Sequence, residues 1–171
     1  MTAMDETTPQ ALAPSASQTV LSRVMTVTDT NLLGSVHGGV VMKLVDDVAG
    51  LVANRHSGGP AVTVALDEMA FLVPVRVGDL LHAEARVNWA GRTSMELGVR
   101  VFAERWDQIG PRHRVATAYL VFVAVDADGE PRPVPQLVLE TDEDGRRFRE
   151  AEIRRTHRLA RREAIQASRR P

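Results

Sequence analysis

The chain has 171 residues, of which 44% are apolar and 25% are charged. These values are typical of a single globular domain that buries its own core, and they exclude a wholly disordered chain. The absence of cysteine excludes disulfides, thiolate nucleophiles and cysteine-ligated zinc. The formal net charge is −1, but ten arginines and only three glutamates lie between Arg146 and Arg170. The C-terminal end is therefore basic and the rest of the chain is correspondingly acidic.

Residues 1–18 are rich in Thr, Pro, Ala and Ser, and they carry acids where a signal peptide would carry Lys or Arg. This composition predicts a disordered leader. No apolar stretch approaches the roughly 20 residues that are needed to cross a bilayer. We therefore expect no membrane span and a cytoplasmic protein.

The first predicted strand is residues 19–28, where β-branched and polar residues alternate. After turn-forming residues at 29–35, apolar residues recur every three or four positions over residues 37–56, which predicts a helix. Its apolar face is so wide that the helix must be covered on most sides. Four more strands are predicted at residues 61–73, 80–89, 94–105 and 113–125, and the short turns between them indicate an antiparallel sheet.

This order of elements predicts an α+β fold in which an antiparallel sheet of about five strands curls around one long helix. That arrangement is the hotdog fold, and we expect residues 19–130 to form it as a single domain. Residues 131–171 are predicted to be a Pro-rich linker followed by an Arg-rich helix at residues 142–168. The strand at 61–73 is a long apolar edge that is charged only at Asp67 and Glu68, which favours pairing with a second copy.

Two glycines, Gly38 and Gly39, stand at the predicted start of the long helix. The free N–H groups of a helix start favour negative charge, so they would stabilise the oxyanion that forms when water attacks a thioester carbonyl. The alternative is a tight turn that requires glycine. His37 is a candidate donor to a ligand, and a capping or turn role is the alternative for this side chain.

Asp46 and Asp47 lie in the middle of the same helix, although aspartate is unfavourable there and a covered carboxylate is costly unless it is paired or functional. The helical period places them on opposite flanks of the apolar face. One hypothesis is that the carboxylate acts as a general base toward water. The other is a salt bridge to Lys43 or Arg55, and spacing alone does not decide between the two.

Other catalytic and binding motifs are absent from the sequence. No pair of histidines has a metal-binding spacing with a carboxylate, so no metal site is expected. No serine lies in a nucleophile elbow, and there is neither a phosphate-binding loop nor a dinucleotide fingerprint. Arg92, Thr93 and Ser94 lie at a turn between two strands, where they could hold phosphates or a pantetheine amide; solvent-exposed turn residues are the ordinary alternative.

Two long runs, VHGGVVMKLVDDVAGLVANRH and VTVALDEMAFLVPVRVGD, strongly resemble the cytosolic acyl-CoA hydrolases of the hotdog thioesterase family. The resemblance extends over about residues 22–164 and includes RTSMELGVRV and PVPQLVLETDEDGRRFREA. It is greatest to the second hotdog domain of the animal brain-type enzyme, and short bacterial members are also similar. A match over several separate motifs is far more specific than any single motif.

The resemblance implies hydrolysis of fatty acyl-CoA to a free fatty acid and CoA, without a metal or other cofactor. It implies a homodimer with active sites at the subunit interface, assembled further into a hexamer as a trimer of dimers. It places the catalytic aspartate at Asp46. Active relatives carry an asparagine just before V-H-G-G, and Ser35 replaces it here. The opposite subunit would contribute this residue to the site. Asn31 in the same loop is a candidate substitute for the missing asparagine.

The expected catalytic residues are therefore Asp46, Ser35 and Gly39. The expected residues for binding CoA or the acyl chain are Asn31, His37, Gly38, Val40, Arg92, Thr93 and Ser94. The alternative function is a non-catalytic acyl-CoA-binding or regulatory hotdog protein, which the serine at position 35 leaves open. A second alternative is nucleic-acid binding through the arginine-rich tail; we expect no nucleic-acid partner, because the tail is helical in pattern.

Overall fold

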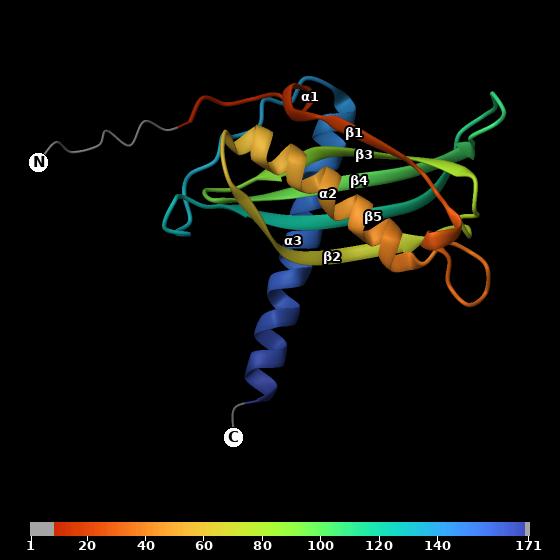
Figure 1. Cartoon of the computed structure of the whole chain (residues 1–171). Helices are drawn as coiled ribbons and strands as arrows, with labels where there is room; N and C mark the ends of the chain where they lie inside the picture. The colour runs from red at the N-terminus through yellow and green to blue at the C-terminus, as the bar shows by residue number, and fades with distance from the viewer. Residues whose placement is uncertain (1–8, 170–171) are drawn as a thin grey trace, which may run out of the picture.

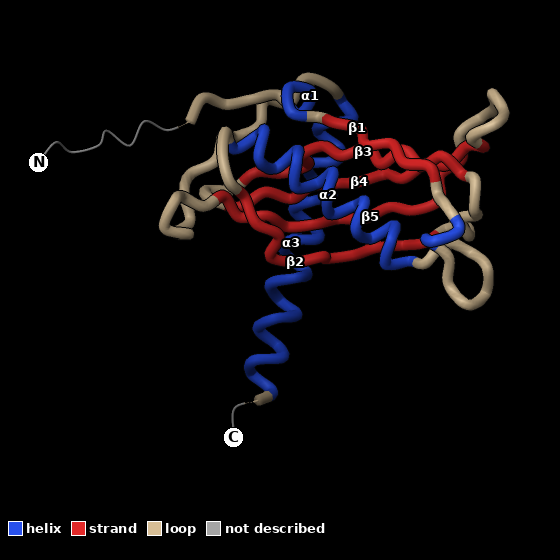
Figure 2. The backbone as a smooth tube through the Cα atoms, viewed as in Figure 1, coloured by secondary structure: helices blue, strands red, loops and turns tan. Residues whose placement is uncertain are grey.

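The structure, a computed structural model, describes residues 9–169, which form a five-stranded antiparallel sheet with one long helix on each face (Figures 1 and 2). The strands are β1 (Thr19–Val24), β2 (Ala61–Phe71), β3 (Asp79–Ala90), β4 (Ser94–Arg105) and β5 (His113–Ala124), and their order in the sheet is β1-β3-β4-β5-β2. The helices are α1 (Pro14–Ser17), α2 (Gly38–Ser57) and α3 (Asp142–Ser168), with a 3-10 turn η1 (Val27–Asp29). The predicted α+β hotdog fold is confirmed.

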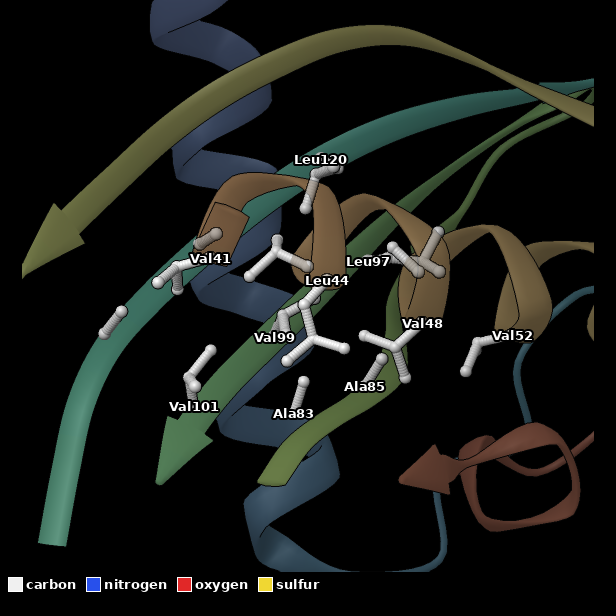
Figure 3. Packing of buried hydrophobic residues seen from close by; sticks show 14 of the residues in the cluster. Val41, Leu44, Val48, Val52, Ala83, Ala85, Leu97, Val99, Val101 and Leu120 are labelled. Atoms are coloured by element: carbon white, nitrogen blue, oxygen red, sulfur yellow. The ribbon is translucent and has the colours of Figure 1, made fainter. Parts of the chain in front are cut away.

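Helix α2 lies along the inner face of the sheet, and the hydrophobic core fills the space between them (Figure 3). Val48 and Val52 on α2 have no exposed surface. Burying a valine side chain contributes about 1.5–3 kcal/mol, so this face fixes the helix on the sheet. The sheet residues below it come from the three central strands and are Ala83, Ala85, Leu97, Val99, Val101 and Leu120.

The ends of α2 follow from local chemistry. His37 is the N-cap residue, and its ring nitrogen Nδ1 accepts a hydrogen bond of 2.9 Å from the backbone N–H of Gly39. Gly58 ends the helix with φ of 69°, a left-handed conformation that glycine adopts without strain. The helix therefore occupies residues 38–57, one residue later at each end than the sequence predicts.

Strand β1 ends four residues before its predicted limit because the chain turns at η1. The carboxylate of Asp29 accepts a hydrogen bond of 2.8 Å from the backbone N–H of Thr26 and also pairs with Arg23. The N–H of Thr26 is the main cause that holds the pKa of Asp29 below its ordinary value. The main-chain oxygen of Asp29 then accepts from the N–H of His37 at 2.8 Å. This buried aspartate thereby ties the turn to the start of α2.

The leader prediction is wrong for residues 9–18, which are ordered, while residues 1–8 lie outside the described part of the chain. Leu12 pairs with Leu137 in a parallel bridge. Ser17 contacts the ring of His56 at 3.3 Å, and the other ring nitrogen lies 3.2 Å from the main-chain oxygen of Pro135. Burial is the main cause that lowers the pKa of His56. The N-terminal segment and the Pro-rich stretch are therefore held together at the end of α2.

Helix α3 crosses the outer face of the sheet, opposite α2, and continues beyond the edge strand β2 (Figure 1). Its bounds agree with the predicted helix. Ion pairs that join it to the sheet include Asp144 with Arg86, Arg154 with Glu96, and Arg158 with Asp67. No helix within residues 9–169 is both long and apolar enough to cross a membrane.

Candidate active site

The two central aspartates of α2 have different partners. Asp46 faces β2, where the hydroxyl of Thr63 donates a hydrogen bond of 2.8 Å to its Oδ1 atom. Asp47 faces solvent and forms an ion pair with Lys43, whose Nζ lies 2.9 Å and 3.0 Å from the two carboxylate oxygens. Within the described residues Oδ2 of Asp46 has no hydrogen-bond donor. The carboxylate of Asp46 is therefore oriented by Thr63 and keeps one free oxygen, whereas both oxygens of Asp47 are paired with Lys43.

The start of α2 offers fewer free N–H groups than the sequence predicts. The N–H of Gly39 donates to His37 Nδ1, and the N–H of Val40 donates to the main-chain oxygen of His37 at 2.9 Å. The ring of His37 acts as a cap, which was the alternative to a ligand-binding role. Of Gly38, Gly39 and Val40 at this helix start, only Gly38 has an N–H without an acceptor in the part of the chain that the structure describes.

An apolar cavity of about 300 Å³ lies beside Gly38. A side chain at this position would place its Cβ 3.3 Å from the ring of Phe71, so glycine permits the close approach of α2 and β2. The cavity is lined only by apolar residues and glycine, namely Val36, Gly38, Val41, Phe71 and the 72–75 segment. This cavity is suited to an aliphatic chain because all the side chains that line it are apolar.

Asn31 and Ser35, the two candidates for the assisting residue, are joined to each other. The Nδ2 atom of Asn31 donates to the hydroxyl of Ser35 at 2.9 Å, and its Oδ1 atom accepts from the N–H of Leu33 at 2.8 Å. Within the described residues of one chain, no hydrogen bond joins either side chain to Asp46. Within one chain the loop therefore makes no direct contact with that carboxylate.

The 92–94 turn is not brought to Asp46. Ser94 lies on the α3 side of the sheet, where it lines a groove beneath that helix. The main-chain oxygens of Arg92 and Thr93 accept hydrogen bonds from Val134 and Ala124. In a single chain these contacts give the turn a structural role at the end of the sheet.

Thr63 is the residue near Asp46 that sequence reasoning misses. It lies in a strand whose pairing with β5 is shifted between Thr63 and Ala65 and again between Leu66 and Glu68. Simple alternation therefore does not say which side chains of β2 face α2. The only local signal is a single hydroxyl among apolar residues in the run AVTVAL.

Comparison with known proteins adds to this geometry. Residues 33–107 match the family profile of the Thioesterase superfamily. The cytosolic acyl coenzyme A thioester hydrolase of Mus musculus is 39% identical over 147 residues, which are 85% of this chain and 39% of that protein. The chain thus spans well under half the length of this curated relative. The crystal structure of an apo-hexameric acyl-CoA thioesterase is 37% identical and has a TM-score of 0.85, over 90% of this chain and 97% of that one.

The acyl-CoA hydrolase of Staphylococcus aureus is also similar, and its structure contains butyryl coenzyme A and coenzyme A. It is 32% identical, with a TM-score of 0.84 over 92% of this chain and 96% of that one. Structures of three alanine variants of the same enzyme are also similar to this chain. The variants replace an asparagine, an aspartate that lies 15 residues after it, and a threonine that lies 17 residues after the aspartate. Asn31, Asp46 and Thr63 have the same two spacings in this chain.

Proposed function

The chain belongs to the Thioesterase superfamily, and on that premise we propose that it hydrolyses acyl-CoA to a free carboxylic acid and CoA. The observation that carries the proposal is the contact between Asp46 and Thr63, together with an apolar cavity at the start of α2. The spacing of Asn31, Asp46 and Thr63 supports it, because three residue types of the S. aureus hydrolase recur at the same intervals. Release of a free thiol from acyl-CoA tests it.

In the mechanism we propose, Asp46 holds a water molecule through its free Oδ2 atom and accepts a proton as the water oxygen attacks the thioester carbonyl. The N–H of Gly38 from a second copy, at the positive end of that copy's helix dipole, stabilises the oxyanion that develops on the carbonyl oxygen, because Gly38 and Asp46 of one chain lie about 12 Å apart along α2. The C–S bond then breaks, and the proton passes from Asp46 to the departing thiolate. The apolar cavity beside Gly38 receives the acyl chain.

This mechanism needs no metal and no cofactor, since a carboxylate and backbone donors supply the chemistry. The mouse relative is a cytosolic hydrolase, which supports a cytoplasmic location for this chain.

A second copy completes the site in this proposal. Strand β2 is an edge of the sheet and exposes Val62 and Val64, so a symmetric pairing of two β2 strands would cover it. Leu32 and Leu33 are exposed at 106% and 92% beside Asn31, which suits a loop that contacts another subunit. Asn31 of one copy would then approach Asp46 of the other, and the hexameric relative supports further assembly of dimers.

We expect light scattering to give a mass that is twice or six times the 18.7 kDa of the chain. The physical reason is that the exposed edge of β2 has unpaired backbone groups and apolar side chains. A stable monomer at micromolar concentration would contradict both the pairing and the shared site.

We expect Thr63→Val to lower kcat roughly 10-fold or more, because a hydrogen bond to a charged group contributes about 1.5–3 kcal/mol and its loss leaves the Asp46 carboxylate free to rotate. Valine keeps the shape of threonine, so folding should be retained. Thr63→Ser is the matched control, since it keeps the hydroxyl and should keep most of the activity. Equal rates for the valine and serine variants would show that the hydroxyl does not position Asp46.

A further inference from the structure

Three side chains on the outer face of the sheet form a hydrogen-bonded chain that plays no part in the reaction proposed for Asp46. The hydroxyl of Ser22 on β1 lies 2.7 Å from Nδ1 of His82 on β3, and Nε2 of the same ring lies 2.7 Å from Oε1 of Glu104 on β4. The residues on either side of His82 belong to the core beneath α2. Because side chains alternate along a strand, the ring of His82 lies on the opposite face of the sheet from α2.

The positions of the protons in this chain follow from the chemistry of Glu104. An ionised carboxylate only accepts hydrogen bonds, so Nε2 of His82 carries the ring proton. The contact with His82 is the main cause that holds the pKa of Glu104 below its ordinary value, and Nε of Arg112, 3.5 Å away, also favours the ionised form. In a neutral ring Nδ1 is then an acceptor, and the hydroxyl of Ser22 donates to it. A hydroxyl, a base and an orienting carboxylate therefore stand in the order that activates a nucleophilic serine.

The serine of this chain is exposed, whereas the base behind it is not. His82 is only 6% exposed, so its ring is held in place, while Ser22 lies on the edge strand β1 where a reagent reaches it. A second serine–histidine contact lacks these features. Ser17 is buried, its hydroxyl lies 3.3 Å from the ring of His56, and the far nitrogen of that ring faces a main-chain oxygen. Of the two contacts, that of Ser22 combines an accessible hydroxyl with a charged orienting group.

The backbone of β1 places a donor beside the hydroxyl of Ser22. The N–H of Met25 donates to the main-chain oxygen of Asp79 at 2.8 Å, and the same register pairs Ser22 with His82. Hydrogen-bonded and non-hydrogen-bonded pairs alternate along an antiparallel ladder. The N–H of Ser22 therefore points away from β3, toward the open edge of the sheet. An N–H at this position is placed to stabilise an oxyanion that forms next to the serine oxygen.

We propose that Ser22 is an activated nucleophile that small carboxylic esters acylate. The hydroxyl oxygen attacks the ester carbonyl while Nδ1 of His82 accepts its proton, and the N–H of Ser22 stabilises the oxyanion. The ester C–O bond then breaks, the alcohol leaves with the proton from His82, and the acyl group remains on Oγ. Glu104 stabilises the imidazolium that exists between the two proton transfers. This activity is separate from the proposed thioester hydrolysis and does not depend on Asp46.

Labelling of the full-length protein with diisopropyl fluorophosphate tests the nucleophile. The reaction forms an Oγ–P bond and releases fluoride, so a modified serine is located by mass spectrometry of peptides. We expect a label on Ser22, and labelling at least about 10²-fold slower in His82→Gln, which lacks the general base. Ser15 is the control within the same molecule, because its exposed hydroxyl donates to the carboxylate of Glu140 at 2.9 Å and no base takes its proton.

Release of p-nitrophenol from p-nitrophenyl acetate tests the acylation. It is measured in the Asp46→Asn background, so that the proposed thioesterase site does not contribute. We expect Ser22→Ala to lower the rate to that of the uncatalysed reaction, whereas Ser15→Ala should leave it unchanged. Glu104→Gln keeps the size of the side chain and removes its charge, and it should slow the release at least about 10-fold, because a hydrogen bond to a charged group contributes about 1.5–3 kcal/mol.

Two results would overturn the proposal. One is labelling of Ser22 that is no faster than that of Ser15, or that is equally fast in the wild type and in folded His82→Gln. The other is an equal rate of p-nitrophenol release with and without the hydroxyl of Ser22. Either result would leave the chain from Ser22 to Glu104 as a structural contact of the outer face. Neither readout uses acyl-CoA, so failure of the proposed thioesterase function would be seen separately.

Discussion

Replacing Asp46 with asparagine is expected to lower kcat for acyl-CoA hydrolysis by about 10²- to 10⁴-fold, the usual effect of losing a general base. Asparagine has nearly the same volume and can still accept the hydrogen bond from Thr63, so the fold should be retained. What it loses is the negative charge that takes the proton from water. The measurement is kcat for the purified variant, with circular dichroism to confirm folding.

Asp47→Asn is the matched control, one residue away on the same helix. It removes an exposed ion pair with Lys43, which contributes at most about 1 kcal/mol to stability, and kcat should change by only a few-fold. Equal losses in the two variants would leave no distinction between the aspartates. A larger loss at Asp47 would contradict the mechanism.

Replacing Arg154 with methionine is expected to reduce the free energy of unfolding by about 3–5 kcal/mol, the usual cost of leaving a buried charge uncompensated. Glu96 is only 1% exposed, and its Oε1 atom lies 2.6 Å and 3.1 Å from two nitrogens of Arg154. The remaining donor, Asn88, is at the longer distance of 3.4 Å. Without the guanidinium, the carboxylate of Glu96 would lose its counter-charge beneath α3.

Urea unfolding, monitored at one fixed protein concentration, measures this change. The control is Arg146→Met, on the same helix, because Arg146 is half exposed and pairs with Glu143 and Glu150 at the surface; its loss should be much smaller. A further change of Glu96→Gln in the Arg154→Met background should recover part of the stability by removing the unpaired charge. Equal destabilisation by Arg154→Met and Arg146→Met would contradict this account of the outer face.

The sequence predicts the regular elements well because their signals are local. The spacing of apolar residues predicts both ends of α2 to within one residue. The observed bounds of α3 are those predicted from its run of charged residues. The short turns between strands predict the antiparallel sheet. The edge position of β2 was expected from its run of apolar residues and is observed in the sheet order.

The parts that sequence reasoning misses depend on residues that are distant along the chain. Residues 9–18 have a composition typical of disorder, yet they are fixed by contacts with Leu137 and His56. The spacing along α2 does not say which of Asp46 and Asp47 is the general base. The hydrogen bond from Thr63, on the neighbouring strand β2, distinguishes Asp46. The capping role of His37 takes one of the N–H groups that the two glycines would otherwise leave free.

Release of CoA by the purified wild-type protein, followed with a thiol reagent over acyl-CoA substrates of increasing chain length, tests the central claim most directly. The chain contains no cysteine, so the protein itself adds no thiol signal. We predict enzymatic turnover that saturates with substrate and depends on chain length, because the acyl chain enters the apolar cavity beside Gly38. Binding of acyl-CoA without release of CoA at any chain length would contradict the claim and would show a non-catalytic binding protein.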